Sequence, residues 1–210
     1  FIREKGVTIS DKKVNKPAFK IQPHHSVELD EGEVLKYSKS VGYRKLEKIA
    51  SSTVFPAFTT SDRCLDLGAN VGGFSLYMLE QGVASVFAIE ISSQYEPYLK
   101  RIKDKWPNFS YRIMNFFDMG IDDFPDTYNV ITADLTLDPR FLVQNLAKLV
   151  QPSRIPARFL ITVKLGKIKD SAALLTDIER SIRTFLPESS LNWLESLPDK
   201  QELVLLVIIA

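Results

Sequence analysis

The sequence predicts an α/β fold built on a mostly parallel seven-stranded sheet, with helices on both faces and an antiparallel closing hairpin. Two observations carry this prediction. Short apolar runs alternate with helical patterns from residue 51 onward, and a glycine-rich turn follows the first strong run. Strands that are separated by helices become parallel neighbours, because a parallel pair needs a crossover connection. The length of 210 residues suits one such domain with a small appendage.

The expected elements follow one another along the second part of the chain. Strands are expected at 63–67, 84–90, 110–114, 128–134 and 158–164, helices at 74–81, 95–105, 140–150 and 172–185, and the closing hairpin at 191–195 and 202–209. Residues 1–34 are expected to form a separate small unit with short strands at 7–9 and 27–29 around a lysine-rich turn. Residues 35–50 then lead into a helix and belong to the main domain, 35–210.

Composition excludes several kinds of protein. The chain has 27 Lys and Arg against 26 Asp and Glu, a net charge of +1, so any contact with nucleic acid must come from local patches. One cysteine, Cys64, excludes a disulfide framework and is expected to pack in the core. His24 and His25 lack further ligands, so we expect them in an exposed loop and expect no metal site. No apolar run reaches the roughly 18 residues of a membrane span and no signal peptide is visible, so we expect a cytoplasmic protein.

The glycine-rich turn is the strongest local signal. Residues 66–74 read DLGANVGGF, directly between an expected strand and an expected helix. This is where a doubly wound sheet binds a nucleotide-like ligand, but the spacing is neither that of a dinucleotide fingerprint nor that of a P-loop. An acid at the strand end, Asp66, disfavours a pyrophosphate and suits a ligand with cationic groups. S-adenosylmethionine is such a ligand.

Two later acids fit the same ligand. Glu90 ends the second expected strand, where a carboxylate can accept both ribose hydroxyls, and Asp118 follows the third, where it can accept the adenine amine. The alternative is that these are ordinary solvated acids at strand ends. The expected cofactor-binding residues are Asp66, Gly68, Asn70, Gly72, Gly73, Phe74, Glu90, Asp118 and Asp134.

The motif at 66–74 resembles the first motif of the FtsJ-type ribose 2′-O-methyltransferases, D-x-G-x-x-x-G-G-F, and the resemblance spans residues 40–210. It implies a Rossmann-like class I fold, S-adenosyl-L-methionine as cofactor and a Lys-Asp-Lys-Glu tetrad. The matching positions are Lys45, Asp134, Lys164 and Glu202. The segment around the first lysine, SVGYRKL, departs from the family pattern at two positions, and Lys48 is an alternative one turn further on.

The tetrad implies a division of roles. A ribose hydroxyl is a poor nucleophile, and a lysine can accept its proton only as a neutral amine, which a second cation and a dry pocket favour. We assign this role to Lys164, with Asp134 orienting it and favouring the sulfonium. Lys45 and Glu202 would position the base and the ribose. Each residue also has a plainer interpretation: a solvated or structural lysine, a strand-start acid, or a carboxylate that binds only the cofactor.

The first part of the chain resembles the second half of a small RNA-binding module found in a small-subunit ribosomal protein and in pseudouridine synthases. Ser10-Asp11 stands where Asn-Gly is usual, a turn that either pair can make. We expect a phosphate-binding patch, with a solvated charged turn as the alternative. The patch would consist of Lys12, Lys13, Lys16 and Lys20.

A partial module of this kind followed by an FtsJ-like domain resembles the haemolysin-A (TlyA) family of ribosomal RNA ribose methyltransferases. The sequence therefore predicts an RNA methyltransferase whose partner is ribosomal RNA or a ribosomal subunit, with no membrane partner and with the oligomeric state left open. Two alternatives stay open: a non-catalytic RNA-binding or assembly protein that has kept the cofactor pocket, and a methyltransferase of small molecules or proteins.

Overall fold

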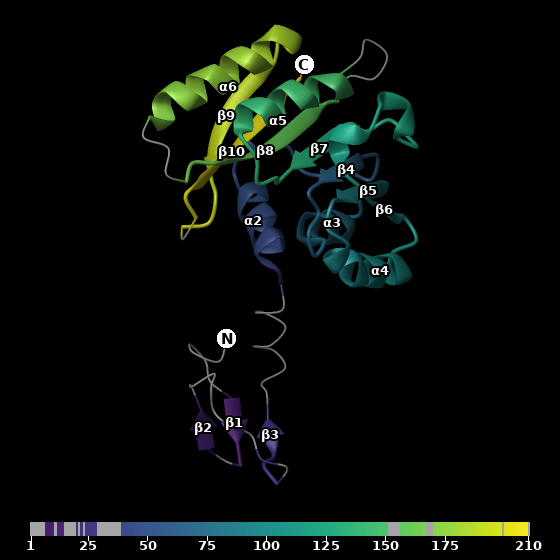
Figure 1. Cartoon of the computed structure of the whole chain (residues 1–210), viewed down its shortest axis with the longest axis vertical. Helices are drawn as coiled ribbons and strands as arrows, with labels where there is room; N and C mark the ends of the chain where they lie inside the picture. Colours follow the sequence, from purple (N-terminus) through teal and green to yellow (C-terminus); the bar gives the residue numbers. More distant parts are fainter. Residues whose placement is uncertain are drawn as a thin grey trace. The chain divides into compact units, whose positions relative to one another are not determined.

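The computed structural model describes residues 7–10, 12–14, 20, 22, 24–28, 39–150, 156–166, 170–198 and 200–209. It divides the chain into two units, residues 1–40 and 41–210. The larger unit is built on one seven-stranded sheet in the order β6-β5-β4-β7-β8-β10-β9 (Figure 1). The strands are β4 (Arg63–Leu67), β5 (Ser85–Glu90), β6 (Phe109–Ile113), β7 (Val130–Ala133), β8 (Arg158–Lys164), β9 (Ser190–Glu195) and β10 (Glu202–Ile208).

The strand directions agree with the prediction. The pairs β4–β5, β4–β7, β5–β6 and β7–β8 are parallel, whereas β10 runs antiparallel to both β8 and β9. The chain moves from β4 outward to β5 and β6, then returns to the other side of β4 for β7 and β8. The carboxyl ends of β4 and β7 therefore border the point where the strand order reverses, which is where open α/β sheets bind ligands.

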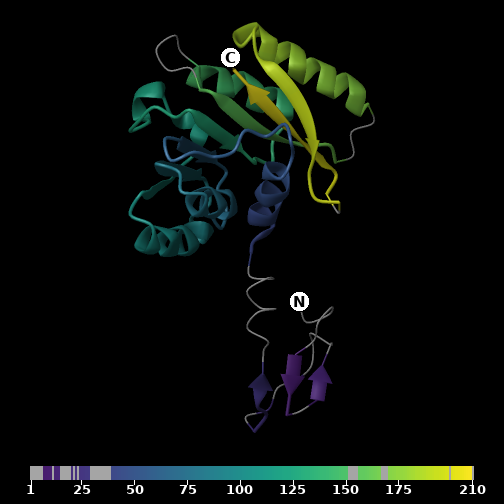
Figure 2. The same ribbon diagram turned by 180° about the vertical axis from the view of Figure 1, so that it is seen from behind.

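Helices cover both faces of this sheet, as Figures 1 and 2 show. The helices are α2 (Val41–Ala50), α3 (Gly73–Glu80), α4 (Glu96–Lys105), α5 (Pro139–Leu146) and α6 (Ser171–Phe185), with 3₁₀ turns η1 (Ser93–Tyr95), η2 (Phe116–Asp118), η3 (Ile121–Asp123) and η4 (Ala147–Leu149). Apolar side chains of α5 and α6 pack in one core cluster, and those of α2, α3 and α4 pack in a second. In the part of the chain that the structure describes, no helix is long and apolar enough to cross a membrane.

The two clusters explain why the central strands are so apolar. A strand that is covered on both faces buries every residue, so its sequence loses the polar alternation of a surface strand. In β4, Leu65 and Leu67 belong to the cluster with α5 and α6, whereas Cys64 belongs to the other. Cys64 is fully buried, as predicted, and burial raises the pKa of its thiol.

The smaller unit contains a three-stranded antiparallel sheet in the order β2-β1-β3. Its strands are β1 (Val7–Ile9), β2 (Lys12–Val14) and β3 (Val27–Glu28). Ser10, with a φ of 46°, makes the predicted turn, and its amide donates to the Ser26 carbonyl. Lys12 and Lys13 lie on a strand rather than in the lysine-rich turn that we expected, and both are exposed, as is Lys20. Lys16 lies outside the described residues.

The two histidines of this unit adopt a loop conformation. His24 is exposed, whereas His25 is half-buried and its Nδ1 accepts a hydrogen bond from the Gln22 amide at 3.0 Å. Across the described residues, no group of three or more His, Cys, Asp or Glu side chains is arranged to hold a metal ion.

Candidate active site

The glycine-rich turn after β4 has a left-handed backbone at three positions, Gly68, Asn70 and Gly72, with φ of 79°, 53° and 81°. A Cβ atom on Gly68 would lie 2.5 Å from Leu135 Cδ2 and 2.9 Å from the Asp134 carbonyl oxygen. On Gly72 it would collide with Ile102 of α4. These glycines are therefore required by the packing of the protein around the turn, in addition to any close approach of a ligand.

Asp66 lies beneath this turn and is 1% exposed. Its Oδ2 accepts hydrogen bonds from the amide and hydroxyl of Ser75 at 3.0 and 2.6 Å, and its Oδ1 accepts one from the Thr132 hydroxyl at 2.9 Å. Burial raises the pKa of this carboxyl to about 6, against the opposing effect of the hydrogen bonds. We expected Asp66 to face a ligand. Its carboxylate lies inside the protein, where it joins the first turn of α3 to β7.

Gly73 and Phe74 open α3 directly after the turn, and both are buried. The ring of Phe74 lies under Lys45, whose Nζ is 5.9 Å from the ring centroid. These two residues therefore help to build the wall of the site from the protein side.

Glu90 connects the turn to the end of β5. Its Oε2 accepts a hydrogen bond from the Asn70 amide and its Oε1 one from the Ser92 amide, both at 2.8 Å. Each carboxylate oxygen has a second lone pair, so Glu90 retains the capacity to accept from two hydroxyls. The next residue, Ile91, is 66% exposed, which places an apolar surface beside this carboxylate.

Asp118 is exposed on the turn η2, and a lysine that our sequence reasoning missed holds this turn in place. Lys148 Nζ donates to the carbonyl oxygens of Phe116 and Met119 at 2.9 and 3.0 Å and lies 4.1 Å from the Phe116 ring centroid. Burial lowers the pKa of Lys148, and the charge of Asp118 acts in the opposite direction. The sequence signal that could have identified Lys148 is its position as a charged residue within the apolar stretch 146–150.

The four residues of the expected tetrad come together at the carboxyl edge of the sheet. Lys45 of α2 places its Nζ 2.7 Å from Asp134 Oδ2 and 2.7 Å from Glu202 Oε1. Lys164 Nζ lies 3.4 Å from Asp134 Oδ1, and Lys164 is the cross-strand partner of Glu202 in the β8–β10 register. We call these four residues the tetrad cluster. It contains two cations and two anions.

Exposure divides the tetrad cluster into an inner and an outer part. The side chains of Lys45 and Glu202 are 4% and 7% exposed, that of Asp134 is 19% exposed, and that of Lys164 is 34% exposed. Lys45 is thus enclosed between two carboxylates, and Lys164 is the cation that a substrate can reach.

Further polar residues support the tetrad cluster. The Ser196 hydroxyl donates to Glu202 Oε1 at 2.6 Å, and Lys48 Nζ donates to the Ser196 carbonyl. The structure therefore brings Lys45 into the cluster and gives Lys48, the alternative, a supporting contact. The Thr136 hydroxyl accepts a hydrogen bond from Lys164 Nζ at 2.9 Å. Neither Ser196 nor Thr136 was identified from the sequence.

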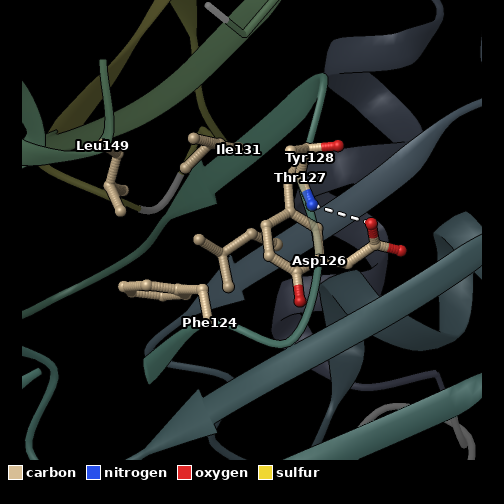
Figure 3. Close-up of a pocket in the computed structure, with 7 residues that line it drawn as sticks. Phe124, Asp126, Thr127, Tyr128, Ile131 and Leu149 are labelled. Carbon is tan, nitrogen blue, oxygen red and sulfur yellow. Dashed lines mark hydrogen bonds between the residues drawn. The ribbon is translucent and has the colours of Figure 1, made fainter. Parts of the chain in front are cut away.

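A shallow pocket lies at the opposite end of β7 (Figure 3). It is lined by Leu65, Phe124, Asp126, Thr127, Tyr128, Ile131 and Leu149. Residues 124–128 lead into β7, whereas Asp134 follows its end. The pocket is therefore not part of the edge that carries the tetrad cluster.

The profile of the FtsJ-like methyltransferases matches residues 39–168, more than half of the chain. The chain belongs to the FtsJ-like methyltransferase family. The matched region holds the glycine-rich turn and three members of the tetrad cluster, while Glu202 lies beyond it. The cofactor of this FtsJ-like methyltransferase is S-adenosyl-L-methionine.

Solved structures share the fold of this FtsJ-like methyltransferase. A hemolysin-type protein of Streptococcus thermophilus is 18% identical with a TM-score of 0.66, covering 100% of this chain and 80% of its own. The Methanococcus jannaschii fibrillarin, a pre-rRNA processing protein, is 13% identical with a TM-score of 0.65, covering 100% and 84%. The Aeropyrum pernix fibrillarin, with natively bound S-adenosyl-L-methionine, is 14% identical with a TM-score of 0.61, covering 80% and 76%. A search of curated protein sequences finds no match.

The residues at the edge of the sheet fit this cofactor. Glu90 keeps two acceptor positions for ribose hydroxyls, and Ile91 presents an apolar surface next to them. Asp118 is exposed and can accept from an exocyclic amine. These groups suit an adenosine without a phosphate.

Proposed function

We propose that this FtsJ-like methyltransferase methylates a ribose 2′-hydroxyl of ribosomal RNA. The observation that carries the proposal is the tetrad cluster, in which Lys45 is enclosed by Asp134 and Glu202 and Lys164 faces outward. An amine held at an open edge by a carboxylate suits the removal of a proton from an alcohol. The fold shared with a pre-rRNA processing protein supports RNA as the substrate class.

S-adenosyl-L-methionine supplies an activated methyl group when it is bound. Glu90 and Asp118 would hold its adenosine through the ribose hydroxyls and the adenine amine. The backbone of the turn at Gly68–Gly72 would border the rest of the molecule. Asp66 would support this arrangement from inside the protein, because its carboxylate already accepts hydrogen bonds from Ser75 and Thr132.

Within the tetrad cluster, Lys164 in its neutral form takes the proton of the acceptor hydroxyl at Nζ. Asp134 lies between the two lysines and orients Lys164 toward the acceptor. Lys45 neutralises the adjacent carboxylates of Asp134 and Glu202, which would otherwise repel each other. Holding the hydroxyl in line with the methyl group can contribute several kcal/mol, up to roughly 7–11 kcal/mol in ideal cases.

The small unit would contribute contacts to the RNA backbone. Lys12, Lys13 and Lys20 are exposed there and can neutralise phosphates without reading sequence. The sequence predicts that these lysines, together with Lys16, make up a phosphate-binding patch. Each lysine that contacts a phosphate would make the affinity fall more steeply with salt.

The test is transfer of a labelled methyl group from the cofactor to ribosomal RNA, followed by mapping of the modified nucleotide. Lys164→Met keeps a long side chain but removes the amine. We expect it to bind the cofactor normally and to lose activity by about 100-fold or more, since general base catalysis contributes 10²–10⁴-fold. Lys100→Met, which removes an exposed lysine of α4, is the matched control and should keep full activity.

Three results would contradict the proposal. A methyl group on a base would exclude ribose methylation, and full activity of Lys164→Met would exclude Lys164 as the base. Cofactor binding without methyl transfer to any RNA would favour a non-catalytic assembly protein. Methyl transfer to another acceptor that ribonuclease treatment leaves unchanged would favour a methyltransferase of small molecules or proteins.

A further inference from the structure

Thr136 lies on the open side of the tetrad cluster, in the segment between β7 and α5. Its hydroxyl accepts a hydrogen bond from Lys164 Nζ at 2.9 Å. The carboxylate that pairs with this lysine is further away, because Asp134 Oδ1 lies at 3.4 Å from Lys164 Nζ. That oxygen is buried and has no hydrogen-bond partner among the described residues. The closest polar contact of Lys164 in the described structure is therefore a hydroxyl.

A hydroxyl can do what a carboxylate cannot. It accepts a hydrogen bond from a charged ammonium and donates one to a neutral amine, whereas an ionised carboxylate only accepts. A lysine that acts as a base passes through both forms. A single hydroxyl can thus hold the amine in the same place before and after proton transfer.

We propose that Thr136 is a positioning residue for Lys164, holding its amine toward the acceptor in both protonation states. This inference rests on the proposed function. Among the described residues, the charged groups that face Lys164 are Asp134, at the end of β7, and Glu202, its cross-strand partner on β10. Lys45 of α2 lies behind both carboxylates. The two ionised carboxylates cannot donate a hydrogen bond to a neutral Lys164 amine. Lys45 could donate one, but its ammonium group is already paired with both carboxylates.

The proposal is tested with Thr136→Val and Thr136→Ser. Valine keeps the shape of threonine and removes the hydroxyl, while serine keeps the hydroxyl. Thr176→Val is the matched control, because Thr176 is an exposed residue of α6 whose hydroxyl donates to the Ala172 carbonyl of the same helix. It should behave as the wild type in every measurement.

The first measurement needs neither RNA nor cofactor. Acetylation of Lys164 by acetic anhydride is followed by mass spectrometry at several pH values, with the exposed Lys100 as internal reference. Thr136→Val removes an acceptor of the ammonium and places a methyl group beside it, both of which favour the neutral amine. We expect Lys164 to react at least about threefold faster at a fixed pH in this variant. Thr136→Ser should react as the wild type does.

The second measurement is the pH profile of methyl transfer. We expect Thr136→Val to lower kcat by about tenfold with an unchanged KM for the cofactor, and to move the acid limb of the profile to lower pH. Thr136→Ser should restore both. A structural role alone would lower stability without moving the acid limb.

The outcomes separate this inference from the proposed function. If no RNA is methylated, the proposed function fails, and the acetylation rates still decide whether Thr136 holds Lys164. Equal acetylation in Thr136→Val and the wild type would overturn the inference. Altered acetylation with unchanged kcat would also overturn it, because the hydroxyl would then hold the lysine without serving transfer.

Discussion

The carboxylate of Asp66 accepts two hydrogen bonds from Ser75, one from its backbone amide at 3.0 Å and one from its hydroxyl at 2.6 Å. The pair joins the end of β4 to the first turn of α3 and so encloses the glycine-rich turn between them. Thr132 of β7 satisfies the other carboxylate oxygen. Asp66 therefore supports the glycine-rich turn from inside the protein. Because its carboxyl is buried, ionising it has a high free-energy cost.

Asp66→Asn should stabilise the protein in a pH-dependent way. The pKa of Asp66 rises from 3.8 in the unfolded chain to about 6 in the folded protein. Between pH 3.8 and pH 6, the carboxyl is therefore protonated in the folded state and ionised in the unfolded state. Wild-type stability from this group is therefore greatest below pH 4 and falls as the pH rises to 6, by roughly 3 kcal/mol. Asparagine stays neutral, accepts from Ser75 and donates to Thr132. Urea unfolding from pH 4 to 8 should show the advantage of the variant growing up to pH 6 and constant above it.

Contributions to stability that the two proteins share cancel when their unfolding free energies are compared at the same pH, so the pH-dependent difference reports the Asp66 substitution. A difference that does not change with pH would show that Asp66 ionises as easily in the folded protein as in the unfolded chain. Ser75→Ala is the matched variant. It removes one donor to the ionised form, so it should raise the pKa of Asp66 in the folded protein further and extend the loss of stability to higher pH.

The helix and strand pattern was predictable because it depends on local burial. β4, β7 and β8 are apolar runs since helices cover both of their faces. The helix expected at 140–150 ends at Leu146 and continues as the 3₁₀ turn η4. Leu149 in that turn is still buried, so the apolar pattern continues although the hydrogen bonding changes. A hydrophobic pattern reports burial and does not distinguish these two kinds of helix.

The supporting residues of the site were less predictable, because their contacts join distant parts of the chain. Ser196 meets Lys48 from 148 positions further along, and a lone serine has no periodic signal. Asp66 is a different case. Cys64 and Asp66 are two positions apart in β4, so their side chains point to the same face of the sheet, toward the second core cluster. This spacing can be seen in the sequence alone. It indicates a carboxylate under the sheet surface rather than at the edge.

Gly68→Ala should weaken cofactor binding, whereas Gly82→Ala should not. Both glycines have a φ of 79°, so both substitutions carry the cost of a left-handed conformation, about 1–2 kcal/mol. A Cβ on Gly82 has nothing within 4 Å, but one on Gly68 meets Leu135 and the Asp134 carbonyl. The segment that carries Asp134 must then move. We expect calorimetry to show the dissociation constant of S-adenosyl-L-methionine rising by about tenfold or more only in Gly68→Ala. Equal affinities in the two variants would contradict this reading of the turn.

Lys148→Met should loosen the turn that carries Asp118. Methionine keeps the apolar stem but loses both hydrogen bonds to the carbonyls of Phe116 and Met119, each worth roughly 1.5–3 kcal/mol for a charged donor. We expect weaker binding of S-adenosyl-L-methionine by calorimetry and faster amide hydrogen exchange in residues 116–119. Lys103→Met is the control, because Lys103 also donates to a carbonyl, that of Pro107, but on the exposed side of α4. Unchanged amide hydrogen exchange in Lys148→Met would show that these two hydrogen bonds do not hold the turn in place.

Two ion pairs of equal length should differ in their value to stability. Arg158–Asp62 and Arg63–Asp126 both have a nitrogen–oxygen distance of 2.7 Å, but their side chains are 7% and 7% exposed in the first pair and 51% and 41% in the second. The guanidinium of Arg158 also lies over the rings of Phe55 and Phe58.

Asp62→Asn removes the charge that compensates a buried Arg158, and we expect urea unfolding to show a loss of about 3–5 kcal/mol. Asp126→Asn should cost less than about 1 kcal/mol, because water and salt screen an exposed pair. Adding Arg158→Met to Asp62→Asn should cost less than the two single losses together, since the uncompensated charge disappears. Similar losses from Asp62→Asn and Asp126→Asn would mean that distance rather than burial determines the contribution of these pairs.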